Sequence, residues 1–191
     1  EFRRVLFRSR IIFLRICEDR SFEKYELLKE IGRGGTSEVY LAMDANLNKQ
    51  WAVKAVDLSG RTINDAAALR NALAEAELMK RLDYPAFPRI VDIFSENEKL
   101  YIVMDYIEGE TLKSISAGDK EISEEMLLDW GEQLAGAIGY LHSLTPPVIY
   151  RDLKPSNIML NPEGRIKIID FGIARENKGS DTMALGSEGY A

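Results

Sequence analysis

The sequence predicts an α+β fold built from two lobes. Short runs of β-branched and aromatic residues, broken by glycines and polar turns, dominate its first half, and a long amphipathic helix leads its second half. The 191 residues are 46% hydrophobic and 29% charged, which is the composition of a globular protein. A chain of this length forms one ordinary domain or two small lobes.

Five strands are expected in the first half, with the spacing of an antiparallel meander. They are the runs 25–31, 39–43, 51–56, 90–95 and 100–105. A glycine-rich turn separates the first two strands, and the polar turn Glu96-Asn97-Glu98 separates the last two. Two further short strands, 158–160 and 165–169, flank a turn at 161–164.

Two helices are expected. Residues 64–82 are rich in Ala, Leu, Glu and Arg, and Tyr84-Pro85 ends this helix. Ser123 is the predicted N-cap of a second helix over 123–143, and residues 107–122 show no clear pattern. The apolar residues of the second helix recur at helical spacing: Met126, Leu127, Trp130, Leu134, Ala137, Ile138 and Leu141.

Charge and composition exclude several classes of protein. The net charge is −6 and the body of the chain has no run of Lys or Arg, which argues against a nucleic-acid partner. Purely apolar runs such as Ile11 to Leu14 are far shorter than the roughly 20 residues that span a bilayer. One cysteine and one histidine form neither an internal disulfide nor a structural zinc site. We therefore expect no membrane segment here and a cytoplasmic location.

The first nine residues differ in character from the rest. Residues 1–9 (EFRRVLFRS) match the in-frame translation of a sequencing-library adapter at every codon, so we interpret them as a cloning scar. Residues 10–21 are then a lead-in to the folded part.

A glycine-rich segment lies between the first two predicted strands. Glycines without a Cβ let backbone N–H groups approach phosphates closely, and such residues here are Gly32, Gly34 and Gly35, followed by the small Ser37. By itself the segment is also consistent with an ordinary turn. A dinucleotide-binding loop would open a helix, whereas this segment opens a strand.

Lys54 interrupts an otherwise apolar strand. A single strand lysine usually points to solvent. Glu75 on the following helix offers a partner, and a buried Lys–Glu pair would hold the ammonium where it contacts the α- and β-phosphates. Glu77 is the rival partner, on another face of the helix.

The segment Tyr150-Arg151-Asp152-Leu153-Lys154-Pro155-Ser156-Asn157 is the most specific string in the chain. Asp152 can accept a hydroxyl proton, Lys154 can neutralise a transferring phosphoryl group and Asn157 can ligate a metal. Asp170-Phe171-Gly172 follows a predicted strand, and a carboxylate there is suited to hold Mg²⁺ against phosphates.

Together, in this order, these motifs resemble a protein kinase catalytic domain over about residues 22–191. The resemblance implies a complete small lobe, with a five-stranded antiparallel sheet and one helix, and an incomplete helical large lobe. It places the small lobe and hinge at 22–108 and the partial large lobe at 109–191. The implied ATP-binding residues are Ile31, Gly32, Gly34, Gly35, Ser37, Val39, Ala52, Lys54, Met104, Asp105, Tyr106, Ile107 and Met159.

The resemblance also implies the chemistry. Asp152 would be the catalytic base with Lys154 beside it, Lys54 would pair with Glu75, and Asn157 and Asp170 would bind Mg²⁺. Lys154 is typical of serine/threonine kinases, and residues 147–160 are similar to the membrane-anchored kinases of Gram-positive bacteria. The expected substrates are therefore protein Ser and Thr hydroxyls. A pseudokinase scaffold and a small-molecule kinase are the alternatives.

Two features depart from the family pattern. Tyr150 replaces the usual histidine, and its ring is expected to stack on Phe171. The chain also ends at Ala191, before an A-P-E motif, so we expect this piece alone to be an inactive kinase. Arg151 is expected to bind a phosphate on Ser180 or Thr182, added by autophosphorylation in trans, whereas Ser187 is expected to lie near the substrate.

Overall fold

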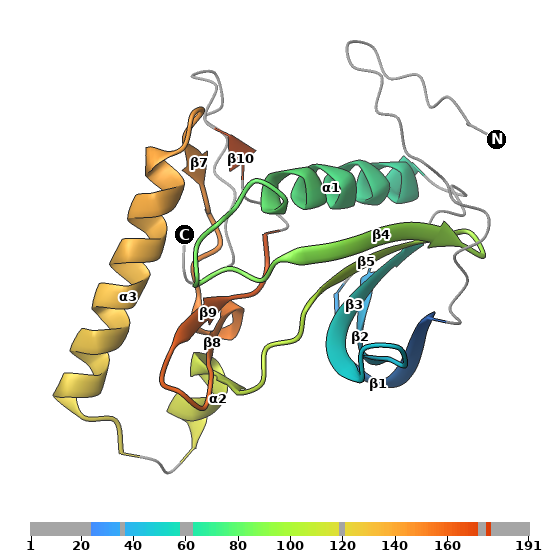
Figure 1. Cartoon of the computed structure of the whole chain (residues 1–191). Helices are drawn as coiled ribbons and strands as arrows, with labels where there is room; N and C mark the ends of the chain where they lie inside the picture. Colours follow the sequence, from blue (N-terminus) through green and yellow to red (C-terminus); the bar gives the residue numbers. More distant parts are fainter. Residues whose placement is uncertain (1–23, 35–36, 58–62, 119–120, 172–174, 177–191) are drawn as a thin grey trace. The chain divides into compact units, whose positions relative to one another are not determined.

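The computed structural model describes residues 24–34, 37–57, 63–118, 121–171 and 175–176 (Figure 1). The chain folds into two compact units. The first comprises Glu1–Arg70 with Ile90–Asp105, and the second comprises Asn71–Arg89 with Tyr106–Ala191. The chain thus crosses between the units after Arg70, after Arg89 and after Asp105, and the last crossing lies within the predicted hinge.

A five-stranded antiparallel sheet forms the first unit, as predicted. Its strands are β1 (Tyr25–Arg33), β2 (Ser37–Asp44), β3 (Lys49–Asp57), β4 (Ile90–Glu96) and β5 (Lys99–Asp105). They lie in the order β1-β2-β3-β5-β4, and each adjacent pair is antiparallel. Strands β3 and β5 hold most of the buried residues of the sheet.

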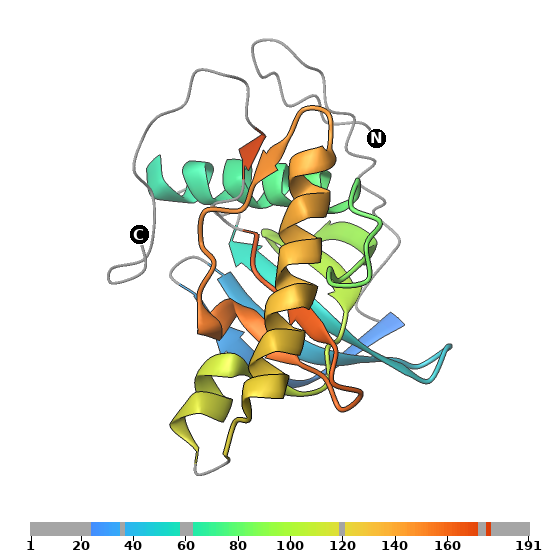
Figure 2. The ribbon, with the colours of Figure 1, turned by 90° about the vertical axis from the view of Figure 1, so that its left-hand side faces the viewer.

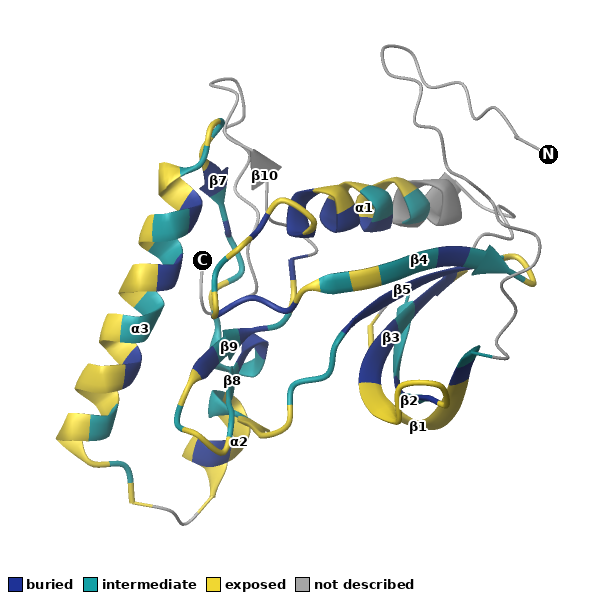
Figure 3. Cartoon of the chain, in the orientation of Figure 1, coloured by how far each residue is buried: buried dark blue, intermediate teal, exposed yellow. Residues whose placement is uncertain are grey.

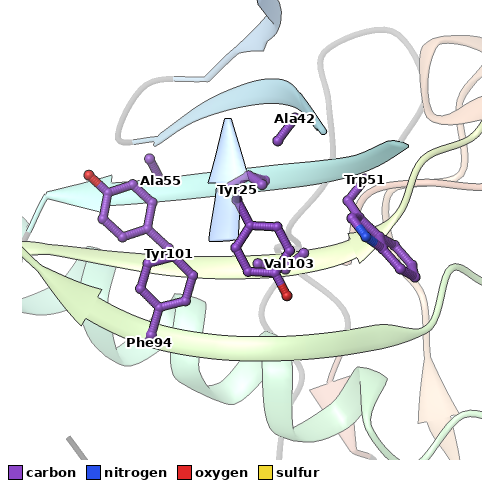
Figure 4. Packing of buried hydrophobic residues seen from close by; sticks show 8 residues of the cluster. Tyr25, Ala42, Trp51, Ala55, Phe94, Tyr101 and Val103 are labelled. Carbon is purple, nitrogen blue, oxygen red and sulfur yellow. The ribbon is translucent and has the colours of Figure 1, made fainter. Parts of the chain in front are cut away.

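An aromatic cluster forms the core on one face of this sheet (Figure 4). Tyr25 and Phe94 stack with ring centroids 6.0 Å apart, and Phe94 and Tyr101 stack at 5.1 Å. Trp51, Val53 and Ala55 join the cluster from alternate positions of β3. Because side chains alternate across a strand, Ala52, Lys54 and Val56 face the other side of the sheet.

Helix α3 (Glu124–Ser143) is the longest element of the second unit. The other elements of this unit are the second part of α1 (Ile63–Met79), β6 (Glu110–Thr111), α2 (Leu112–Ala117), β7 (Val148–Ile149), the 3-10 turn η2 (Pro155–Asn157), β8 (Ile158–Leu160), β9 (Ile166–Ile168) and β10 (Arg175–Glu176). Strands β6, β8 and β9 form one antiparallel sheet, and β7 pairs with β10 (Figure 2).

Helix α3 begins as predicted. The Ser123 side chain accepts a hydrogen bond from the Met126 N–H at 3.2 Å, which caps the helix. Trp130, Ala137 and Leu141 are buried, and the buried parts of α3 lie on the side of the helix toward β7 and β9 (Figure 3). Leu127 belongs to the predicted apolar stripe but is 55% exposed.

Helix α2 and strand β6 were missed by the sequence analysis, which found no pattern in 107–122. The helix has only six residues, too few for a periodic signal. Its caps are nevertheless visible in the sequence: Thr111 accepts a hydrogen bond from the Ser114 N–H at 3.1 Å, and Gly118 follows the last turn. Among the described residues, no helix is long and apolar enough to cross a membrane.

Candidate active site

The predicted catalytic loop connects β7 to β8 and adopts a strained turn at its start. The Asp152 N–H donates to the Tyr150 carbonyl at 3.0 Å, and Arg151 between them has a φ of 67°. A non-glycine residue in this left-handed region costs of order 1–3 kcal/mol and persists only where its surroundings fix it. Such strain clusters at functional sites, and here it sets the direction of the next side chain, Asp152.

Three predicted site residues meet at the Asp152 carboxylate. The Lys154 ammonium donates to its Oδ2 at 2.7 Å, and the Asn157 Nδ2 donates to the same oxygen at 2.9 Å. Asn157 also donates to the Asp152 backbone carbonyl at 3.1 Å. Charge-assisted hydrogen bonds of this length stabilise the ionised carboxylate, which is the form that accepts a proton. The structure therefore brings Asp152, Lys154 and Asn157 together.

The β8–β9 hairpin links Asn157 to Asp170. Ile158 pairs with Ile168 at one end of the hairpin, and the Ile169 N–H donates to the Asn157 carbonyl at 3.0 Å. Asp170 comes one residue after this hydrogen bond and is exposed. The backbone of both predicted metal ligands is thus held in one register by the same hairpin.

The donor set suits Mg²⁺, a hard cation that prefers oxygen ligands. Because the Asn157 Nδ2 is bound to Asp152, its amide oxygen points away from that carboxylate. No cluster of three or more His, Cys, Asp or Glu able to hold a metal occurs among the described residues. A Mg²⁺ held by Asn157 and Asp170 would accordingly take its remaining oxygens from phosphates and water, which is the usual mode for this ion.

Contacts between aromatic rings support the predicted catalytic loop. The Tyr150 and Phe171 centroids are 5.3 Å apart with an interplanar angle of 81°, so the predicted ring contact is confirmed and has edge-to-face geometry. Phe171 makes a second edge contact with Phe87 at 5.3 Å. Phe87 was not predicted from the sequence to be near the site. Its position between Pro85 and Pro88 is the feature of the sequence that could have indicated it.

The Tyr150 hydroxyl is buried and has no hydrogen-bond partner among the described residues. Burial raises the pKa of this phenol, and the negative charges of Asp170 and Asp152 raise it further. Tyr150 is therefore neutral at physiological pH. We infer that its ring, and not its hydroxyl, supports the loop.

Substitution of Tyr150 tests this inference. Tyr150→Phe keeps the ring and removes an unsatisfied buried hydroxyl, so the free energy of unfolding should stay within about 1 kcal/mol of the parent or rise. Tyr150→Ala should lower it by about 3–5 kcal/mol, because it leaves a cavity beside Phe171. Urea denaturation measures both, and a large loss in Tyr150→Phe would show that the hydroxyl has a structural role.

In the first unit, four predicted ATP-binding residues share one face of the sheet. Val39 pairs with Lys54 across β2 and β3, and Ala52 pairs with Met104 across β3 and β5. Directly paired residues point to the same face, and Ala52 and Lys54 are two positions apart. Ala52 and Met104 are buried and Lys54 is half-buried. This face therefore combines a flat apolar surface with one ammonium group.

The glycine-rich hairpin connects β1 to β2. Gly32 pairs with Val39, and the Gly34 N–H donates to the Ser37 carbonyl at 2.8 Å. Ile31 is 41% exposed, at an irregularity of the β1–β2 register. Gly35 lies outside the described residues.

The backbone conformation of this hairpin does not require a glycine at position 32 or 34. An added Cβ at Gly32 would meet Val39 Cβ at 3.7 Å, and one at Gly34 would meet Ser37 Oγ at 3.5 Å. Both are ordinary contacts, and neither residue has a positive φ. Close approach of another molecule to the backbone would explain the glycines.

The remaining predicted residues lie in both units. Met159 is half-buried in β8, and Asp105 and Ile107 flank the passage between the units. Glu75 is buried in the second unit and Lys54 belongs to the first, so their pairing stays a prediction. The rival Glu77 is exposed and forms an ion pair with Lys80 at 2.8 Å. Ser180, Thr182 and Ser187 lie outside the described residues.

Comparison with known proteins identifies the family. The protein kinase domain profile matches residues 25–191, and the chain therefore belongs to the protein kinase family. It is 36% identical to the serine/threonine-protein kinase PrkC of Bacillus subtilis over 151 residues, which are 79% of this chain and 23% of PrkC. The predicted similarity to bacterial serine/threonine kinases is thus confirmed.

Two further relatives have a similar identity. The serine/threonine-protein kinase PknD of Chlamydia trachomatis is 36% identical over 165 residues, 80% of this chain and 17% of PknD. The human serine/threonine-protein kinase tousled-like 1 is also 36% identical, over 177 residues, 87% of this chain and 23% of its own length. The chain spans less than a quarter of the length of these relatives.

Proposed function

We propose that this chain supplies the nucleotide-binding and catalytic segment of a serine/threonine protein kinase. The observation that carries the proposal is the Asp152 carboxylate, held by Lys154 and Asn157 on the loop that also leads into the β8–β9 hairpin. Family membership and the serine/threonine kinases among the relatives support the same activity.

In the proposed reaction, Asp152 accepts the proton of a substrate Ser or Thr hydroxyl. The hydroxyl oxygen forms a bond to the γ-phosphorus of ATP while the bond from that phosphorus to the β-phosphate bridging oxygen breaks, which releases ADP. Lys154, 2.7 Å from Asp152, is placed to neutralise charge on the moving phosphoryl group. Mg²⁺ bound by Asn157 and Asp170 would neutralise the phosphates.

The nucleotide is proposed to bind on the face of the first unit that carries Val39, Ala52, Lys54 and Met104. The apolar side chains there suit an adenine ring, and the ammonium suits phosphates. The other proposed ATP-binding residues are Ile31, Gly32, Gly34, Gly35, Ser37, Asp105, Tyr106, Ile107 and Met159, and Glu75 is the proposed partner of Lys54.

Substitution of Gly32 separates nucleotide binding from folding. In Gly32→Ala the new Cβ makes only ordinary contacts with Val39, so stability should change by less than about 1 kcal/mol. Affinity for ATP should fall roughly tenfold, about 1.4 kcal/mol, because the Cβ keeps phosphates from the backbone. Titration with a fluorescent ATP analogue measures this.

Gly131→Ala is the matched control. A Cβ at this exposed position of α3 meets nothing within 4 Å, so nucleotide affinity should be unchanged. Equal nucleotide affinity in Gly32→Ala and Gly131→Ala would contradict the role of the hairpin.

The activity itself is tested with a complete catalytic domain that contains this sequence. We expect phosphate transfer from ATP to Ser and Thr peptides, no transfer to Tyr peptides, and loss of transfer when EDTA removes Mg²⁺. Nucleotide binding without any transfer would instead support the pseudokinase alternative. The domain is proposed to act in the cytoplasm.

Autophosphorylation is proposed at Ser180 or Thr182, in trans. The Arg151 guanidinium, on the strained turn next to Asp152, is the proposed phosphate partner, through a bidentate contact. Mass spectrometry after incubation with ATP should find phosphate within residues 175–187. Phosphate found solely elsewhere would overturn this assignment.

A further inference from the structure

We propose that Gln133 of α3 is a positioning residue for the metal-binding pair Asn157 and Asp170. The proposal rests on the kinase function proposed above and adds a residue that no catalytic motif contains. Gln133 lies in the middle of α3, far in sequence from both metal ligands, and acts on them through the β8–β9 hairpin.

Both polar atoms of the Gln133 amide bind the hairpin. Its Nε2 donates to the Gly164 carbonyl at 3.1 Å, and its Oε1 accepts from the Ile166 N–H at 2.9 Å. The Nε2 also donates to Asp129 Oδ2 at 2.8 Å, one helical turn earlier. These three contacts fix the orientation of the amide, because exchange of its nitrogen and oxygen would break all of them.

The β8–β9 hairpin carries the position of the Gln133 contacts to the metal ligands, because it is short and held together by its own hydrogen bonds. Gly164 is the last residue of the hairpin turn, and Ile166 begins β9. Asn161 closes the turn: its side chain accepts a hydrogen bond from the Arg165 N–H at 2.7 Å, its backbone N–H donates to the Arg165 carbonyl, and its carbonyl accepts from the Gly164 N–H. Only three residue pairs separate this turn from the end at which Ile169 bonds the Asn157 carbonyl.

So short a hairpin is not stable alone and takes its position from its neighbours. Helix α3 is such a neighbour, with Trp130 and Ala137 buried on either side of Gln133 in the sequence. Apolar packing is not directional and would not by itself fix the register between the helix and the hairpin. The two amide hydrogen bonds are directional, and they fix where the hairpin lies along the helix.

Mutation of a residue that contacts a metal ligand, but not the metal itself, typically changes the metal affinity by 10–100-fold. Gln133 acts one step further away, through a hairpin. We therefore expect an effect at or below the lower end of this range for loss of both hydrogen bonds.

The test uses Gln133→Met, which keeps the length of the side chain and removes its hydrogen bonds, in a complete catalytic domain. For each variant, the affinity for fluorescent ADP is measured at a series of Mg²⁺ concentrations. The readout is the Mg²⁺ concentration at which half of the total increase in ADP affinity is reached. We expect this concentration to rise three- to tenfold, with metal-free ADP affinity unchanged. Glu132→Met, the exposed neighbour on α3, is the matched control and should leave both quantities at parental values.

Gln133→Glu covers the case in which Gln133→Met does not fold. It keeps the acceptor for Ile166 and loses the donor to Gly164, so it should also raise the Mg²⁺ concentration. A lower melting temperature with an unchanged Mg²⁺ concentration in either folded variant would overturn the proposal and leave Gln133 a purely structural residue. If the parent itself shows no Mg²⁺-dependent gain, the proposed kinase function fails first, which separates the two failures.

Discussion

Replacement of Asp152 by asparagine should reduce phosphoryl transfer by about 10²–10⁴-fold, the range typical for loss of a general base. An amide cannot accept the substrate proton as a carboxylate does. ATP affinity should remain close to that of the parent, because the proposed role of this residue is to act on the incoming hydroxyl and not to hold the nucleotide.

The local structure should survive this substitution. An asparagine at 152 keeps one oxygen, which can still accept a hydrogen bond from Lys154 or Asn157. Steady-state kinetics with a peptide substrate measure the loss, and circular dichroism checks the fold. The exposed Asp83→Asn is the control for the same chemical change and should retain full activity. Comparable turnover in Asp152→Asn and the parent would rule out the assigned role.

The second large effect is expected for Lys54→Met. Lys54 is half-buried on the face of β3 proposed to bind the nucleotide, and its ammonium is the proposed contact of the α- and β-phosphates. Its loss should reduce kcat/KM by roughly 10²–10³-fold, the size observed when one electrostatic contact to the reacting groups is removed. Unlike Asp152→Asn, this change should also weaken ATP binding.

A surface lysine provides the control. Lys80→Met removes an ammonium from an exposed position directly after α1, outside the sheet, and should change neither kcat/KM nor ATP affinity. Titration with a fluorescent ATP analogue and peptide phosphorylation give the two quantities separately. Unchanged kcat/KM in Lys54→Met would show that the nucleotide binds elsewhere.

The sequence predicted the elements whose signals are local. The five strands of the sheet were predicted from short apolar runs. The start of α3 was predicted from Ser123, whose hydroxyl accepts a hydrogen bond from the Met126 N–H, three residues further along the chain. The catalytic loop was recognised for the same reason. Asp152, Lys154 and Asn157 are within five residues of one another, so their contacts depend mostly on the loop itself.

Signals that are weak or distributed were missed. Helix α2 is too short for a periodic pattern, and only its caps mark it. The left-handed backbone of Arg151 is not a preference of arginine, and the sequence contains no glycine or asparagine there that would indicate it.

What the sequence by itself determined is therefore the five strands of the large sheet, the two long helices, the β8–β9 hairpin, the sequence motifs and the family. Only the tertiary structure decided which distant segments meet. Gln133 reaches Gly164 and Ile166 across 31 and 33 residues, and Phe171 rests on Phe87, 84 positions earlier (171 − 87). The physical reason is that short-range patterns fix backbone conformation and caps, whereas hydrogen bonds and ring contacts between remote segments arise only when the elements pack together.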